Sequence, residues 1–166
     1  MPSERLSRFP KHPKTEQILS EICPGVAVRF RRLRYDWQRY QDLDLLISSG
    51  IRSFEEQQKL YNQGRVTPGK IVTNAKPGKS LHNYGLALDV FMGGKDPFLS
   101  LNRELWDLFG AFAESTGFTW GGRFKLQDKC HIECSFTMSA DTLLKIYDFN
   151  GLTGVYYQVD KICGMT

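Results

Sequence analysis

Four side chains between residues 82 and 131 have the types that metal chemistry uses. Asp89 interrupts the otherwise apolar stretch Gly85–Phe91, and a carboxylate in such a stretch needs an ion partner or a metal. His82 lies in the loop before it, and His131 begins a second alternating segment. Two histidines and one aspartate can hold a zinc ion and leave a fourth position open. Asp128, just before His131, could act beside the metal as an acid–base group.

The residues alone leave other interpretations open. A lone histidine is more often structural than a ligand, and Asp89 could instead pair with an arginine such as Arg52 or Arg123. The spacing from His82 to Asp89 is not a helical i, i+4 pair, so a metal site needs a loop that folds back onto a strand. Three histidines nearly exclude a site of three or more histidines, and the four cysteines form neither a paired CxxC site nor a disulfide framework.

The elements that would position these groups are helices mixed with short strands, which predicts an α+β fold. Hydrophobic periodicity and capping residues predict helices over 15–22, 26–41, 54–63, 102–116 and 139–149. Alternation predicts strands over 44–49, 85–91 and 131–136, and an edge strand in the tail from Gly151. Residues 65–81 form a long loop, of the kind that is usually functional or disordered.

Composition and charge restrict the class of protein. The 166 residues suggest one domain, and 41% hydrophobic with 24% charged residues indicates a folded chain. No apolar run approaches the ~20 residues of a membrane span, so we expect no stable membrane insertion. The net charge of +4 is concentrated in the first 40 residues, around Arg29–Arg34. Such a patch suits a polyanion or the solvated face of a helix; without a nucleic-acid motif, we expect no nucleic-acid partner.

Three separated blocks resemble one family of zinc peptidases. Ser80-x-His-x-x-Gly-x-Ala-x-Asp89 is similar to the SxHxxGxAxD signature of D-alanyl-D-alanine carboxypeptidases, D-alanyl-D-alanine dipeptidases and L-alanyl-D-glutamate endopeptidases, a family that includes VanY-like and phage endolysin-like peptidases. The segment SGIRS at 49–53, with EQQ at 56–58 and LYNQGR at 60–65, resembles a second block of that family. WGG at 120–122 with DKCHIE at 128–133 resembles a third. The resemblance runs from about residue 44 to 136 and is closest to the endopeptidase branch.

The resemblance implies a fold and a set of site residues. The fold is α+β, with a small central antiparallel sheet flanked by helices and a zinc site at one sheet face, as in Hedgehog-like and DD-peptidase-like domains. The implied zinc ligands are His82, Asp89 and His131; the catalytic residues are Asp128 and Arg52; the substrate-binding residues are Gln57, Ser80 and Trp120. Asp128 would move the proton, and Arg52 would stabilise the scissile carbonyl or the developing oxyanion. Arg123 and Cys130 depart from the residues that many members have at these positions.

A metal-binding histidine needs its second ring nitrogen held by an acceptor. We therefore expect each ligand histidine to donate from that nitrogen to a carbonyl or a carboxylate. Glu133, two residues after His131 on the same face of the predicted strand, is the candidate partner of His131.

We expect a lead-in over 1–25, a zinc peptidase catalytic domain over 26–150, and a tail over 151–166 packed on the same domain. The expected activity is zinc-dependent cleavage of peptidoglycan stem peptides at the L-alanyl-D-glutamate bond, as in an endolysin or a wall-remodelling enzyme. One alternative is a D-alanyl-D-alanine carboxypeptidase in which Arg123 or Lys125 holds the terminal carboxylate. Another is a non-catalytic zinc-binding module whose arginine-rich segment holds an anionic partner.

The expected partner is the stem peptide, and we expect the chain to act as a monomer on the cell wall, in the periplasm or outside the cell. The first twenty residues lack the apolar core of a signal peptide. We therefore expect either phage-type release or a leader that has been removed. No segment resembles a wall-binding domain.

Overall fold

The core of the fold is a four-stranded antiparallel sheet with the strand order β1-β2-β4-β3. The computed structural model describes residues 10–93 and 101–164. The strands are β1 (Asp44–Ser49), β2 (Ala87–Gly93), β3 (Thr119–Trp120) and β4 (His131–Glu133). The helices are α1 (Pro13–Glu21), α2 (Pro24–Tyr40), α3 (Phe54–Asn62), α4 (Arg103–Ser115) and α5 (Ala140–Ile162), with short 3₁₀ turns η1 (Leu81–Tyr84) and η3 (Gly121–Arg123). The α+β prediction is confirmed.

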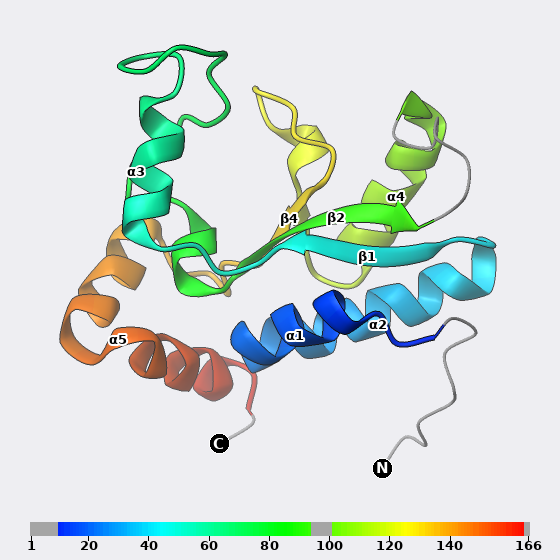
Figure 1. Cartoon of the computed structure of the whole chain (residues 1–166). Coiled ribbons are helices and arrows are strands. Elements are labelled where there is room, and N and C mark those ends of the chain that lie inside the picture. Colours follow the sequence, from blue (N-terminus) through cyan, green and yellow to red (C-terminus); the bar gives the residue numbers. More distant parts are fainter. Residues whose placement is uncertain (1–9, 94–100, 165–166) are drawn as a thin grey trace.

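One face of the sheet lies on the apolar core. Figure 1 shows α1 and α2 side by side beneath β1 and β2, while α3 and the long loop after it stand on the other side. In β2, Leu88 and Val90 are fully or almost fully buried in this core. Because side chains alternate along a strand, Asp89 between them points to the opposite face. The predicted alternation of this strand is confirmed, and it separates the core face from the face that carries the polar residues.

The C-terminal tail is helical, so the predicted edge strand is wrong. Helix α5 continues to Ile162, with a bend at Gly151, where φ is 62° and ψ is −159°. Val155 and Val159 are both fully buried. Their i, i+4 spacing puts them on one helix face, and Val159 packs against α2 where Gly25 has no side chain.

The predicted strand over 131–136 is shorter than expected. Strand β4 ends at Glu133, and Phe136 and Thr137 have positive φ values of 48° and 65°. This left-handed backbone turns the chain out of the sheet and toward α5.

The arginine cluster of α2 is paired within the fold. Arg34 is buried and donates two hydrogen bonds of 2.7 Å to Asp44. The other partners are Glu16 for Arg31, Asp36 for Arg32, and the carbonyl of Gly117 for Arg29. These contacts explain the cluster as part of the framework. Within the described ranges, no helix combines the length and the hydropathy that crossing a membrane requires.

Candidate metal centre and active site

The pairing of β2 with β4 places Asp89 directly opposite His131. The Nδ1 atom of His131 lies 3.3 Å from Oδ1 of Asp89. His82 approaches from η1, and its Nε2 atom lies 3.3 Å from the same oxygen and 3.3 Å from Nδ1 of His131. The loop therefore folds back onto the strand, as the spacing required. The three predicted ligands converge on one point.

Local packing explains how η1 holds His82 there. Gly85 ends the turn with φ 65°, and a β-carbon at this position would lie 2.4 Å from the hydroxyl of Tyr156. Only glycine fits this close, left-handed position. Asn83 then donates from its amide to the carbonyl of Arg52 at 3.0 Å, which ties the turn to the segment before α3. One turn thus fixes the backbone of both His82 and Arg52.

The second ring nitrogen of each histidine has an acceptor. Nδ1 of His82 lies 2.6 Å from the carbonyl oxygen of Gly50, and Nε2 of His131 lies 2.9 Å from Oε2 of Glu133. These acceptors require the N–H at those atoms, so in the neutral imidazoles the other nitrogens are the ones free to bind a metal. The predicted contact between His131 and Glu133 is confirmed.

The donor set fits a zinc ion. All three donor–donor distances are 3.3 Å, and the three atoms form a possible metal-binding group. Tetrahedral ligands at about 2.0–2.1 Å from one ion are themselves separated by about 3.3–3.4 Å. Two imidazole nitrogens and one carboxylate oxygen are also the ligand types that zinc accepts.

The electrostatics of the three groups favour a charged, paired arrangement. Burial raises the pKa of Asp89, but the hydrogen bonds from His131 and His82 outweigh this and hold that pKa well below its usual range. Burial lowers the pKa of His131, but the carboxylates of Asp89 and Glu133 outweigh it and raise the pKa to about 9. A metal ion bound here must therefore displace a proton from His131.

Arg52 lies beside Asp89, and its guanidinium is held in place by Gln57. Its Nη2 atom is 3.5 Å from Oδ2 of Asp89, and its Nη1 atom donates to Oε1 of Gln57 at 3.0 Å. Gln57 is fully buried, and its amide donates to the carbonyl of Ala75 at 2.8 Å. Gln57 is not among the residues that line the cavity, and its expected contact with substrate stays a prediction. Its position suits holding the guanidinium of Arg52.

Asp128 stands on the opposite wall. It is exposed, and one of its carboxylate oxygens lies within 4.8 Å of a carboxylate oxygen of Asp89. The Sγ atom of Cys130 lies 3.0 Å from Oδ1 of Asp128, and the thiol donates to it. Burial, followed by the hydrogen bond to Asp128, raises the pKa of Cys130 well above its usual value, so the group stays a donor. Sequence reasoning noted Cys130 only as a departure and missed this contact.

The other two predicted substrate-binding residues, Ser80 and Trp120, differ in whether they line the cavity. Ser80 is nearly buried but lines the cavity. Trp120 is 2% exposed, and its indole donates to the carbonyl of Lys129 at 2.8 Å, beneath the segment that carries Asp128. Trp120 therefore supports that segment from inside the core. It is not among the residues that line the cavity, and its expected contact with substrate stays a prediction.

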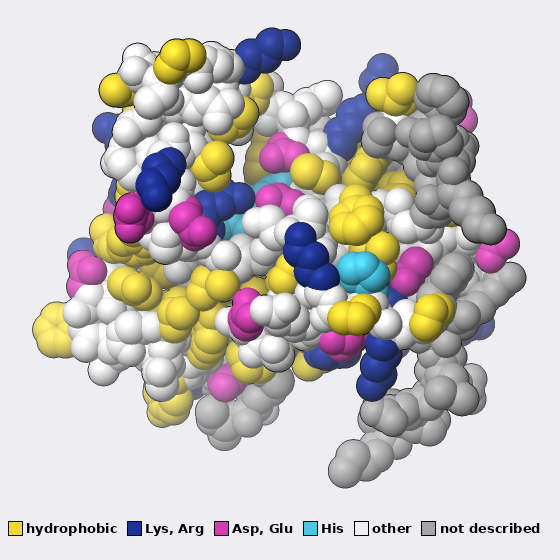
Figure 2. All heavy atoms as spheres, in the orientation of Figure 1, with side chains coloured by type: hydrophobic (Ala, Val, Ile, Leu, Met, Phe, Trp, Pro, Cys, Tyr) yellow, Lys and Arg dark blue, Asp and Glu magenta, His cyan; other side chains and the backbone are white. Residues whose placement is uncertain are grey.

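The site opens into a cavity of about 720 Å³. Figure 2 shows a hollow on this face in which histidine, acidic and basic side chains gather. Lining residues that sequence reasoning did not single out include Ile71, Val72, Asn74, Lys79, Phe124 and Leu126. Those between 65 and 81 lie in the long loop whose length was the one available signal.

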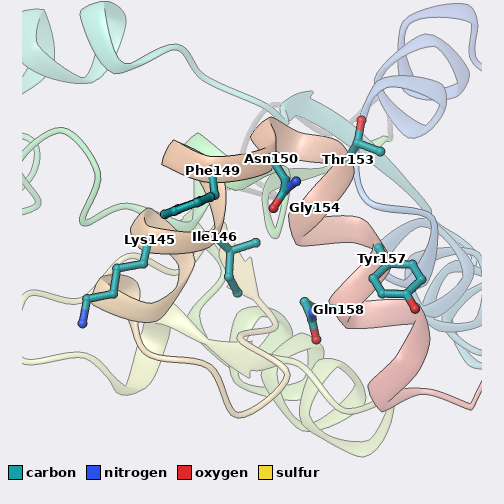
Figure 3. A pocket seen from close by; sticks show the side chains of 8 residues that line it. All are labelled: Lys145, Ile146, Phe149, Asn150, Thr153, Gly154, Tyr157 and Gln158. Carbon is teal, nitrogen blue, oxygen red and sulfur yellow. The ribbon is translucent and has the colours of Figure 1, made fainter.

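A second cavity lies in the bend of α5, and its lining residues differ in type from those of the candidate metal centre. It measures about 630 Å³ and is lined by Lys145, Ile146, Phe149, Asn150, Thr153, Gly154, Tyr157 and Gln158 (Figure 3). No carboxylate, cysteine or histidine is among these lining residues. The larger cavity, which is lined by the ionisable side chains of His82, Asp89, Asp128 and His131, is therefore the candidate active site.

Comparisons with known proteins agree with this location. Residues 73–134 match the family model described as D-alanyl-D-alanine carboxypeptidase. The chain is 41% identical over 101 residues to the peptidoglycan L-alanyl-D-glutamate endopeptidase CwlK of Bacillus subtilis (strain 168). That match covers 55% of this chain and spans 60% of the relative's length. The family resemblance found in the sequence is confirmed.

Solved structures support the fold. The L-Ala D-Glu endopeptidase ChiX of Serratia marcescens superposes with a TM-score of 0.56 at 21% identity, covering 80% of this chain and 95% of that chain. DacB from Streptococcus pneumoniae D39 superposes with a TM-score of 0.51 at 21% identity, covering 82% and 77%. At this identity the likeness concerns the fold, and it agrees with the sheet and helices described above.

Proposed function

We propose that this chain, whose residues 73–134 match the family model described as D-alanyl-D-alanine carboxypeptidase, is a zinc-dependent peptidase that cleaves peptidoglycan stem peptides at the L-alanyl-D-glutamate bond. One observation carries the proposal. His82, Asp89 and His131 present three donor atoms, each 3.3 Å from the other two, beside a 720 Å³ cavity that Arg52 and Asp128 also line.

Zinc held by those three residues would supply a Lewis acid and a nucleophile generated from water at neutral pH. Asp128 takes up the proton that the attacking water loses and returns it to the leaving amine. The guanidinium of Arg52, held by Gln57, stabilises the negative charge that develops on the scissile carbonyl oxygen. Glu133 and the carbonyl of Gly50 keep the two imidazoles oriented throughout.

The choice of bond is supported by the relatives. CwlK is an L-alanyl-D-glutamate endopeptidase and shares 41% identity with the matched region. We extend that specificity to this chain, and with it action on the cell wall as a monomer in the periplasm or outside the cell.

A second candidate is a D-alanyl-D-alanine carboxypeptidase, which the description of the matched family favours. Such an enzyme needs a cation for the terminal carboxylate, for which Arg123 or Lys125 was expected. Arg123 instead donates to Glu114 at 3.1 and 3.3 Å, and neither residue is among those that line the cavity. Neither residue therefore holds a carboxylate in this cavity, and the identity with CwlK supports the endopeptidase as the first candidate.

The test compares zinc-loaded wild type with Asp128→Ala and His131→Ala on purified cell walls. We expect the Asp128 variant to keep its zinc and lose about 10²–10⁴-fold in rate. The His131 variant should lose both zinc and activity. Asp148→Asn, which changes an exposed carboxylate outside the cavity, is the matched control and should clear walls at the wild-type rate. If both variants clear walls as fast as wild type, the proposal is wrong.

The same zinc-loaded preparation distinguishes the peptidase from the remaining alternative, a non-catalytic zinc-binding module. Hydrolysis that needs zinc and stops with a chelator removes it. Zinc binding without any hydrolysis of walls or stem peptides would favour it over the peptidase.

A further inference from the structure

Two arginine or lysine side chains are among the described residues that line the cavity, and they differ in how they are held. Arg52 is committed to Gln57 and Asp89, and its side chain is 17% exposed. The side chain of Lys79 is 46% exposed and pairs with Asp141 in the first turn of α5. Asp141 is not one of the cavity-lining residues. Lys79 is therefore the cation that an incoming anion can reach.

The backbone beneath Lys79 is fixed although its side chain is exposed. The amide of Lys79 donates to the carbonyl of Lys76 at 2.9 Å. At the preceding residue, the amide of Gly78 donates to the Asn83 side chain at 3.0 Å, and the hydroxyl of Tyr84 donates to the Gly78 carbonyl at 2.8 Å. The same η1 turn carries His82, so the base of the Lys79 side chain is fixed relative to the metal ligands.

The ion pair with Asp141 is easily exchanged. Both side chains are substantially exposed, at 46% and 71%, and exposed ion pairs contribute little to stability. A carboxylate bound inside the cavity is less hydrated than Asp141, and a charge-assisted hydrogen bond to it is correspondingly stronger. The ammonium of Lys79 can thus leave Asp141 for a substrate carboxylate at small cost.

The proposed substrate carries such a carboxylate next to the cleaved bond. Cleavage between alanine and glutamate leaves glutamate as the new amino-terminal residue. Glutamate has two carboxyl groups, and continuation of the peptide uses one. The other stays free, one residue from the scissile carbonyl.

We propose that Lys79 binds this free glutamate carboxylate and so selects stem peptides with an acidic residue on the leaving side of the bond, a specificity that rests on the proposed endopeptidase function. When no substrate is bound, the ammonium pairs with Asp141, which competes with the substrate carboxylate for it. Lys79 is then a determinant of specificity, whereas Arg52 acts on the reacting carbonyl.

The experiment uses two stem peptides that differ in one group, with the free carboxyl of the glutamate present in one and converted to an amide in the other. Both carry an amidated carboxyl terminus, so that no terminal carboxylate competes. Wild type, Lys79→Met, Lys79→Arg and Asp141→Asn are assayed with each peptide. Lys76→Met, which changes an exposed lysine of the same loop outside the cavity lining, is the matched control.

Lys79→Met should lower kcat/KM for the acidic peptide about tenfold, the lower end expected for a hydrogen bond to a charged group, and leave the amide peptide within about twofold. Lys79→Arg should restore most of the loss, because it keeps the positive charge. Asp141→Asn should not lower kcat/KM for either peptide, because it removes only a competitor. Lys76→Met should behave as wild type.

Equal losses on both peptides, or parallel losses in Lys79→Met and Asp141→Asn, would make Lys79 a structural residue and overturn the proposal. No loss on either peptide would overturn it as well. Failure of wild type to cut either peptide between alanine and glutamate would instead refute the proposed function itself, and the role of Lys79 with it.

Discussion

Replacing Gln57 by leucine tests whether Gln57 holds Arg52, the proposed catalytic arginine, in position beside the cavity. The fully buried amide accepts from Nη1 of Arg52 and donates to the carbonyl of Ala75. Leucine has a similar volume but leaves both partners without their hydrogen bond. A buried polar group left in this way costs about 1–3 kcal/mol, and both partners are only partly enclosed, so we expect a loss of about 2–3 kcal/mol.

For a domain of this size, such a loss corresponds to a melting temperature lower by roughly 5–10 °C. Arg52 also loses the contact that aims its guanidinium at the carbonyl, which should lower kcat about 10–100-fold. Because Gln57 does not line the cavity, KM should stay within about twofold of wild type. Zinc content should not change, since Gln57 contacts none of the three ligands.

The assay combines steady-state hydrolysis of a stem peptide at several concentrations, thermal unfolding and metal analysis. Gln58→Leu is the matched control, because the neighbouring Gln58 is exposed and bonds only to Asn62 within α3. A rise in KM at constant kcat would place Gln57 in contact with substrate. That result would refute the positioning role.

Four further outcomes follow from other contacts of the site. Glu133→Gln should weaken zinc affinity about 10-fold, because the charged acceptor that orients His131 is lost; an unchanged affinity in competition with a chromogenic chelator would contradict this. Because the pKa of His131 is raised to about 9, zinc affinity should tighten by about one log unit per pH unit between about pH 7 and 8, and a pH-independent affinity would be inconsistent with it. In the metal-free protein the stabilisation from this raised pKa is complete below about 6.5 and is lost as the pH rises through about 9, so the melting temperature should fall over that interval. Arg65→Ala removes hydrogen bonds to Thr73 and Asn74 in one cavity wall and should raise KM about tenfold without loss of zinc, whereas an unchanged KM would show that the wall does not depend on Arg65.

The strand that carries Asp89 could be predicted because its alternation separates an apolar face from a polar one. Its partner could not be predicted from periodicity, since register depends on how β2 and β4 meet in three dimensions. The metal-site hypothesis required the loop with His82 to fold back onto this strand, but the periodicity did not predict that it does. The family resemblance named the three ligands, and the structure shows how the sheet register and the Gly85 turn bring them together.

The wrong prediction for the tail has a physical cause. The tail after Gly151 was predicted as a strand because its aromatic and β-branched residues favour strands. Val155 and Val159 are both buried, and Val159 packs against α2; this favours a helix there, because tertiary packing outweighs local preference. The resemblance names Gln57 and Trp120 without their depth in the fold, and neither is among the residues that line the cavity. Gln57 holds Arg52, which lines the cavity, and Trp120 donates to the carbonyl of Lys129, next to Asp128 in the chain.

The central claim is tested most directly by mass spectrometry of a stem peptide digested with the zinc-loaded protein. We predict two products separated between L-alanine and D-glutamate, with the terminal D-alanine retained. Release of a single D-alanine with the alanyl-glutamate bond intact would contradict the endopeptidase. A peptide left whole under conditions in which the protein is folded and holds zinc would contradict the peptidase altogether.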